Sequence, residues 1–184
     1  MLDTILDSPL SSWLQLDTDA TDHIVISSRI RLARNFDGVL FTNRNDMSSL
    51  EKVNSFSRSL LKPLKDVDGH QYSNINLEQL SERDRAILVE KHLMSPALEE
   101  KLPYRNLVVS DDASIVIMVN EEDHLRIQSM VSGLRLEVAY ERVLKIDKAI
   151  EAKYAYAFDE RFGYLTACPT NVGTGLRASV MLHL

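Results

Sequence analysis

The sequence contains a single cysteine, Cys168, so no disulfide can form within the chain. The absence of disulfides is typical of a reducing compartment and predicts a cytoplasmic location. No apolar run approaches the roughly 20 residues that a membrane-spanning helix needs. The first residues, 1–7, are acidic and lack the basic segment of a secretory signal. We therefore expect a soluble protein that has no membrane partner.

An excess of positive charge is also missing, because 21 Lys and Arg are outnumbered by 27 Asp and Glu, for a net charge of -6. Such a chain repels nucleic-acid phosphates at long range, so direct nucleic-acid binding is not expected. A local cluster of arginines could still hold a small anion. The chain shows no repeat or Pro/Gly-rich linker, and its 184 residues are predicted to form a single domain, 1–184.

The apolar pattern predicts an α+β fold with a mainly antiparallel β-sheet flanked by helices. Helices are expected over 48–61, 77–93 and 134–154, and strands over 23–31, 106–110, 114–120, 124–130 and 164–167. Residues 1–20 are interpreted as an irregular arm, with a short helix pinned by Trp13, and 67–76 as a loop. After a loop at 169–175, residues 176–184 are expected to begin a helix. Because that helix has no stop signal, we expect the chain to be truncated at its C-terminus.

The first chemically informative segment is Ser27-Ser28-Arg29-Ile30-Arg31. In a strand, Arg29 and Arg31 share one face because side chains alternate with a period of two. Their planar guanidinium groups suit bidentate binding of phosphate oxygens. The alternative is a pair of arginines on a solvated face.

The second segment is Asn120-Glu121-Glu122-Asp123-His124-Leu125-Arg126. Three consecutive acids at the end of a strand could raise one another's pKa, act as a base or bind a cation. If the backbone stays extended, Glu122, His124 and Arg126 lie on one face. The alternative is an acidic turn with solvated charges.

The third segment runs from Cys168 to Met181 (CPTNVGTGLRASVM). A polar, glycine-containing loop leads into the expected helix, whose first backbone N–H groups could hold an anion beside Arg177. Positive potential there could lower the pKa of Cys168. The alternative is a buried structural cysteine before an ordinary helix. The segment lacks the Gly-Lys-Ser/Thr ending of a Walker A loop.

Taken together and in order, these three segments resemble signature segments of the guanidino kinases, the ATP:guanido phosphotransferases. Residues 89–93 (VEKHL) resemble the family too, and the resemblance extends from about Ser11 to the end of the chain. Residues 11–13 and 29–35 resemble the protein arginine kinases within that family. Small-molecule guanidino kinases carry a helical domain before the first arginine motif. In this sequence that motif begins at Ser27, which leaves no room for such a domain.

The resemblance implies the guanidino kinase catalytic-domain fold, which is glutamine-synthetase-like, and transfer of the γ-phosphoryl group of ATP, with Mg²⁺, to arginines of proteins. It implies a catalytic base, Glu122, assisted by Glu121 and Asp123, with Cys168 beside the guanidinium. Arg29, Arg31, Arg126 and Arg177 would bind phosphates. The remaining implied nucleotide-site residues are Ser27, Ser28, Ile30, His92, Ala178, Ser179, Val180 and Met181, and no protein metal ligands are implied.

Implied partners are protein substrates with exposed arginines, an activating protein, a stress-response repressor, the Clp protease and a second copy in a homodimer. Phosphoarginine formation in protein quality control would be the biological role. Two alternatives stay open. One is a kinase of a small guanidino compound. The other is a truncated, non-catalytic module that binds nucleotide.

Overall fold

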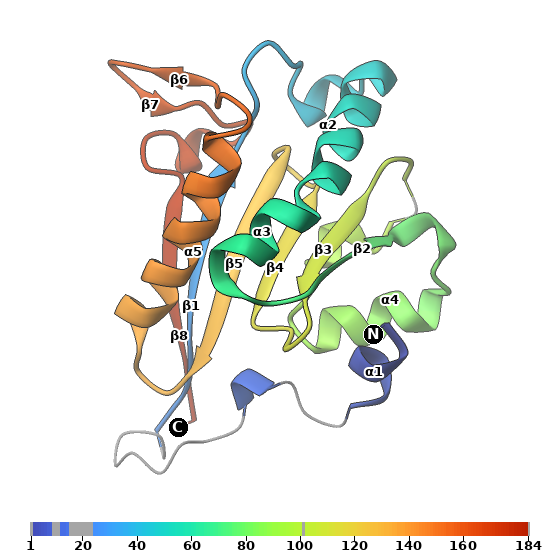
Figure 1. Ribbon diagram of the computed structural model, residues 1–184, viewed down its shortest axis with the longest axis vertical. Coiled ribbons are helices and arrows are strands. Elements are labelled where there is room, and N and C mark those ends of the chain that lie inside the picture. Colours follow the sequence, from blue (N-terminus) through green and yellow to red (C-terminus); the bar gives the residue numbers. More distant parts are fainter. Residues whose placement is uncertain (1, 9–11, 15–23, 101, 184) are drawn as a thin grey trace.

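The computed structural model describes residues 2–8, 12–14, 24–100 and 102–183. Its centre is a six-stranded sheet of order β2-β3-β4-β5-β1-β8, in which every neighbouring pair is antiparallel (Figure 1). The sheet strands are β1 (Val25–Arg34), β2 (Tyr72–Asn76), β3 (Asn106–Ser110), β4 (Ile115–Val119), β5 (Leu125–Ser132) and β8 (Leu176–Leu182). A separate small hairpin pairs β6 (Phe158–Asp159) with β7 (Gly163–Tyr164).

One face of the sheet is covered by three helices, α2 (Met47–Ser59), α3 (Leu61–Asp68) and α5 (Leu136–Glu151) (Figure 1). Alternate residues of the strands point to this face because side chains alternate along a strand. Ile30 and Leu32 of β1 pack here in one apolar cluster with residues of β4, β5 and α5. The long helix α5 packs across β5 and β1, so it supports these two strands on the helix-covered face of the sheet.

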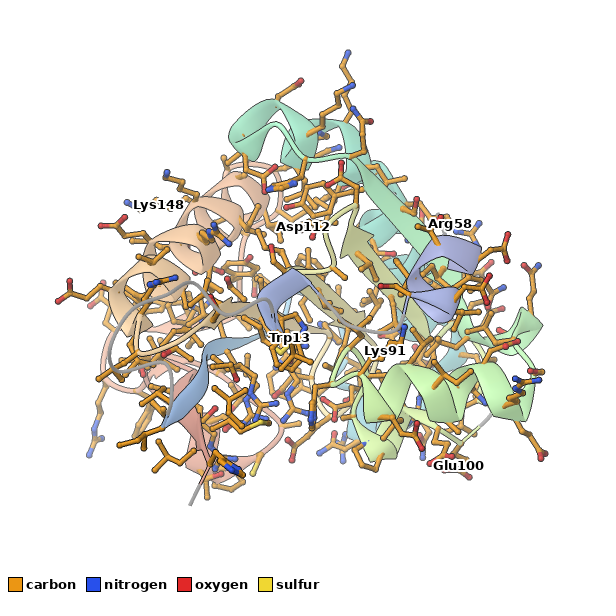
Figure 2. The ribbon with its side chains drawn as sticks, turned by 90° about the horizontal axis from the view of Figure 1, so that it is seen from below. Trp13, Arg58, Lys91, Glu100, Asp112 and Lys148 are labelled. Carbon is orange, nitrogen blue, oxygen red and sulfur yellow. The ribbon has the colours of Figure 1, made fainter. Side chains whose placement is uncertain are left out.

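The opposite face has a second apolar cluster, formed with α1 (Leu2–Asp7), α4 (Glu82–Glu90) and the short 3₁₀ turn η1 (Ser12–Leu14). Lys91, just after α4, fastens the N-terminal segment because its ammonium donates to the carbonyl oxygens of Ile5, Leu6 and Ser8. Figure 2 shows Lys91 next to α1 and Trp13 on the turn that crosses the sheet. Arg29 and Arg31 belong to this same face of the sheet.

The fold class predicted from the sequence is confirmed, and so are the hairpin of β3 and β4 and the long helix α5. The strand expected over 164–167 is reduced to β7 (Gly163–Tyr164), and the strand expected over 23–31 extends to Arg34. Two expected helices also differ. The helix expected over 48–61 breaks at Leu60 into α2 and α3, and the one expected over 77–93 is a 3₁₀ turn, Leu77–Gln79, followed by α4. A capping box, in which Ser81 and Asp84 bond reciprocally, starts α4 later than expected. No helix in the described ranges is long and apolar enough to cross a membrane.

The prediction of a loop over 67–76 is wrong. Helix α3 continues to Asp68, Gly69 ends it in the left-handed conformation with φ 81°, and Tyr72–Asn76 forms edge strand β2. This strand is polar, and its pairing with β3 rather than its own pattern makes it a strand. Of the arm predicted over 1–20, residues 1, 9–11 and 15–20 lie outside the described residues, as do His23 and Leu184 at the ends of two predicted elements.

The prediction that a helix begins over 176–184 is also wrong. Residues Leu176–Leu182 form strand β8, which pairs along its length with β1. The predicted anion site at a helix start is therefore not formed by this segment. Arg177 instead lies on strand β8, where it pairs with Arg31 of β1.

Gly175 fixes where β8 begins. Its φ is +64°, its carbonyl accepts from the backbone N–H of Ala33 at 2.9 Å, and an added Cβ would meet Ala33 O and Arg34 Nη1 at 2.6 Å each. Gly38 has the same φ of +64° but nothing within 4 Å of an added Cβ. We expect Gly38→Ala to cost about 1 kcal/mol from backbone strain alone, and Gly175→Ala to cost clearly more.

Urea unfolding of the two variants measures this difference, with Gly38→Ala as the matched control for the positive φ. Equal losses of stability would contradict the close packing of β8 against β1.

Candidate functional site

Four candidate arginines converge on one sheet face through the strand register. Arg29 and Arg31 alternate with buried residues along β1, as the sequence predicted. Arg177 of β8 pairs directly with Arg31, and Arg126 of β5 pairs with Ala33, the next position on the same face of β1. Strands distant in sequence therefore place the guanidinium groups together.

This arrangement is electrostatically costly in the free protein. Burial, followed by the charges of Arg29, Arg126 and Arg177, lowers the pKa of Arg31 to about 10. Like charges directly opposite each other on paired strands are destabilising. Among the described residues, Arg126 is the one member of the four with a carboxylate partner, Glu121. A polyanionic ligand such as a phosphate chain would supply the missing negative charge.

Burial, and then the charges of Arg126 and Arg177, also lower the pKa of Arg29. The Nε atom of Arg31 is buried and has no hydrogen-bond partner within the described part of the chain. A buried donor without an acceptor costs free energy, and such groups in native proteins call for an explanation. This unpaired donor adds to the free-energy cost of holding the arginines together in the free protein.

The three consecutive acids between β4 and β5 have three different surroundings. Glu121 is buried and accepts hydrogen bonds from Arg126 and from Ser95 Oγ, the latter at 2.6 Å. Asp123 is buried and accepts from Asn35 Nδ2 and the backbone N–H of Ala167, both at 2.7 Å. Glu122 between them is exposed and faces a cavity. Its two neighbours therefore serve the local structure, and Glu122 is the one available to a ligand.

His124 does not share a face with Glu122 and Arg126, so that expectation is wrong. The backbone bends between β4 and β5, and the His124 ring is fully buried. Its Nδ1 accepts from the backbone N–H of Phe36 at 3.0 Å, and its Nε2 lies 2.9 Å from the carbonyl oxygen of Leu40. Burial lowers the pKa of His124, which favours the neutral ring that this pair of bonds requires. His124 is a structural residue.

The Cys168 pocket is a cavity of about 220 Å³ that brings Glu122 and Cys168 together with Arg31, Arg126 and Arg177. Thr170, Asn171, Gly175 and the β1 residues Leu32 and Ala33 complete its lining. Cys168 is half-buried and its Sγ lies 3.1 Å from Thr170 Oγ1. The bond from Ala167 to Asp123 fixes the segment just before this thiol. A carboxylate, a thiol and three guanidinium groups thus line one cavity.

The Trp13 pocket is a second cavity, of about 230 Å³, and Arg29 lies in its wall. The other residues that line it are Trp13, Ser27, His92, Met130, Ser179, Val180 and Met181. Arg29 Nε donates to Ser179 Oγ at 3.2 Å. Because Arg29 and Arg31 are two residues apart on β1, the two pockets adjoin along that strand.

Three predicted site residues lie elsewhere. The hydroxyl of Ser28 is buried on the opposite face, where it donates to Gly133 O at 2.7 Å and accepts from the backbone N–H of Arg135 at 2.9 Å. Ile30 packs in the apolar cluster behind the sheet, and Ala178 is its partner on β8. The side chains of these residues line neither pocket.

Sequence reasoning missed Trp13 and Asn35 as parts of the site. Asn35 anchors the acidic turn from both sides: its Nδ2 donates to Asp123, and its Oδ1 accepts from the backbone N–H of His124 at 2.9 Å. Its position directly after the arginine-rich strand is the one signal that could have indicated such a role.

The clustered guanidinium groups are chemically suited to a polyanion, and the carboxylate and thiol in the adjoining cavity are suited to a cationic group. Comparison with known proteins identifies the class more closely. Residues 52–184 match the family ATP:guanido phosphotransferase, C-terminal catalytic domain. The chain therefore belongs to the ATP:guanido phosphotransferase family.

Individual relatives agree with this assignment. A protein-arginine kinase of Syntrophomonas wolfei is 46% identical over 179 residues, which are 94% of this chain and 48% of that protein. A protein-arginine kinase of Halothermothrix orenii is 44% identical over 183 residues, which are 100% of this chain and 51% of that protein. The chain thus spans about half the length of the curated relatives it matches.

The fold is shared with a taurocyamine kinase from Schistosoma mansoni that was solved with bound transition state analog components. The TM-score is 0.75 and the identity 31%, over 99% of this chain and 26% of that one. The guanidino kinase fold predicted from the sequence is confirmed.

Proposed function

We propose that this chain forms the nucleotide- and guanidine-binding part of a protein-arginine kinase, which transfers the γ-phosphoryl group of ATP to arginine side chains of proteins. The observation that carries the proposal is the Cys168 pocket, which Glu122 and Cys168 line together with Arg31, Arg126 and Arg177. The sequence relatives named protein-arginine kinase support the choice of acceptor.

The arginine cluster fits the triphosphate. Phosphoryl transfer depends mainly on positioning and charge neutralisation, and bidentate guanidinium groups supply both. Arg29 would hold the nucleotide on the side of the Trp13 pocket, and Arg31, Arg126 and Arg177 the phosphates nearest the acceptor. Glu121 positions Arg126 through their ion pair.

ATP and Mg²⁺ are the general cosubstrate and metal of guanido phosphotransferases. Within the described chain, Glu122 is the one acidic side chain lining either pocket. Mg²⁺ would therefore be held mainly by phosphate oxygens and water, and would neutralise phosphate charge when bound. The protein's own contribution is the arginine cluster.

Glu122 is the proposed base. An arginine guanidinium has a pKa above about 12 and is a poor nucleophile while it is protonated. As the N–P bond forms and the bond from the γ-phosphorus to the ADP oxygen breaks, the departing guanidinium proton would pass to the Glu122 carboxylate. Cys168, on the same cavity, would lie beside the guanidinium and orient it.

The alternative acceptor is a small guanidino compound, since the similar folds include taurocyamine kinase and lombricine kinase. Parallel assays with γ-labelled MgATP distinguish the two. We expect label on an unfolded arginine-rich protein, and little on free arginine, taurocyamine or lombricine at the same guanidine concentration. The same protein with its arginines replaced by lysine serves as the control acceptor. Transfer to the free compounds alone would overturn the proposed substrate class.

A further inference from the structure

Trp13 is the single tryptophan of the chain and lies in the wall of the Trp13 pocket. Its side chain is packed against the sheet at the turn seen in the middle of Figure 2, with 4% of its surface exposed. Met130 and Met181 line the same cavity, and the indole lies 5.9 Å from the ring of His92, with the ring planes tilted by 59°. Part of the lining of this pocket is therefore aromatic and apolar.

The indole N–H of Trp13 is buried and has no acceptor among the residues that the structure describes. Buried tryptophan N–H groups usually have a partner. A buried donor without an acceptor costs free energy, so the position of this indole beside a cavity calls for an explanation.

His92, opposite Trp13, is held in a strained backbone conformation. Its φ is +57°, which is uncommon for a residue other than glycine. Its N–H donates to Val89 O at 2.9 Å, and its carbonyl accepts from Gln128 Nε2 at 2.9 Å. Such strain persists where the surrounding structure imposes it, and it clusters at ligand sites. Here it keeps the imidazole at the pocket, next to the indole.

Arg29 and its hydrogen-bond partner Ser179 line the same cavity, and Arg29 pairs with Met130 across β1 and β5. The Trp13 pocket therefore combines aromatic and apolar side chains with a guanidinium group of the arginine cluster. A nucleotide has the complementary chemistry, with a flat aromatic base and anionic phosphates. Lys91 holds the N-terminal segment on this side of the sheet through the carbonyl groups of α1.

We infer that Trp13 contacts the nucleotide base and is a specificity-determining residue for the nucleotide. The inference rests on the proposed function, because the arginine cluster must hold the phosphates for the base to lie at Trp13. The N-terminal segment is then part of the nucleotide site, and not only a cover for the apolar cluster on this face.

The test uses the intrinsic fluorescence of Trp13, which needs no variant. MgATP and magnesium tripolyphosphate, which lacks a base, are titrated separately, and calorimetry gives both dissociation constants. We expect MgATP to change the emission saturably, and tripolyphosphate to bind without changing it. Trp13→Leu should raise the Kd of MgATP about tenfold, as loss of one aromatic contact to a base does, and leave that of tripolyphosphate unchanged.

Leu14→Ala, on the same turn, is the matched control, since Leu14 packs against the apolar cluster but does not line the pocket. It should leave both constants unchanged. Saturable MgATP binding without a change in emission would overturn the inference, and so would an equal loss of both affinities in Trp13→Leu. Binding of neither ligand to the unmodified protein would instead overturn the proposed function, and the inference with it.

Discussion

Replacing Glu122 with Gln is expected to lower the rate of phosphoryl transfer to arginine by about 10²–10⁴-fold, the usual contribution of a positioned general base. Glutamine keeps the size of the side chain but cannot accept the guanidinium proton. The Glu122 carboxylate is exposed at the Cys168 pocket, so its replacement removes no buried contact. The melting temperature and the Kd of MgATP should therefore stay unchanged while kcat falls.

Glu141→Gln is the matched control, because Glu141 is exposed on α5, on the other side of the sheet. It should keep full activity. Turnover of Glu122→Gln within a few-fold of the unmodified protein would refute the assignment of the base. A fall in kcat accompanied by a lower melting temperature would instead assign Glu122 a structural role.

Replacing Asp147 with Asn is expected to cost about 3–5 kcal/mol of stability, because it leaves a buried guanidinium without its counter-charge. Arg34 of β1 binds Asp147 of α5 with two hydrogen bonds, at 3.0 and 2.8 Å, and both side chains are 4% exposed. Arg34 also donates to Thr174 O at 2.9 Å and lies 3.7 Å from the centre of the Tyr164 ring. One arginine thus joins the helix behind the sheet to the loop that leads into β8.

Urea unfolding measures this cost, with Asp66→Asn on the exposed side of α3 as the control that changes the same group without a buried partner. The control should stay within about 0.5 kcal/mol of the unmodified protein. If Asp147→Asn loses no more stability than the Asp66→Asn control, the buried pair of Arg34 and Asp147 contributes little. The pair would then not explain how the loop before β8 is held in place.

Elements whose own residues determine their conformation could be predicted from the sequence. The apolar strands β3 and β4 and the turn at Asp111 and Asp112 have local signals, and so does the amphipathic helix α5. The edge strands β2 and β8 lack such signals. Residues 72–76 are polar, and 176–182 have apolar positions that fit a helix as well as a strand. Pairing with β3 and with β1 decides their conformation, and no local pattern contains that information.

The site was predictable in its residue types and only partly in its geometry. The three motifs contain Glu122, Cys168 and the four arginines; the strand register brings the arginines to one face, and Glu122 and Cys168 line a cavity with three of them. They did not separate these residues from Ser28 and Ile30, whose side chains point to the other face. Nor could they place Trp13 next to His92, because that contact joins segments far apart in the chain.

The most direct test of the account is transfer of the γ-phosphoryl group itself. The protein is incubated with γ-labelled MgATP and an unfolded arginine-rich protein, and the label on protein is measured before and after mild acid, which cleaves the N–P bond and spares phosphoserine and phosphothreonine. The account predicts acid-labile label that is absent with Glu122→Gln and retained with Glu141→Gln. Acid-stable label, or acid-labile label that persists in Glu122→Gln, would contradict it.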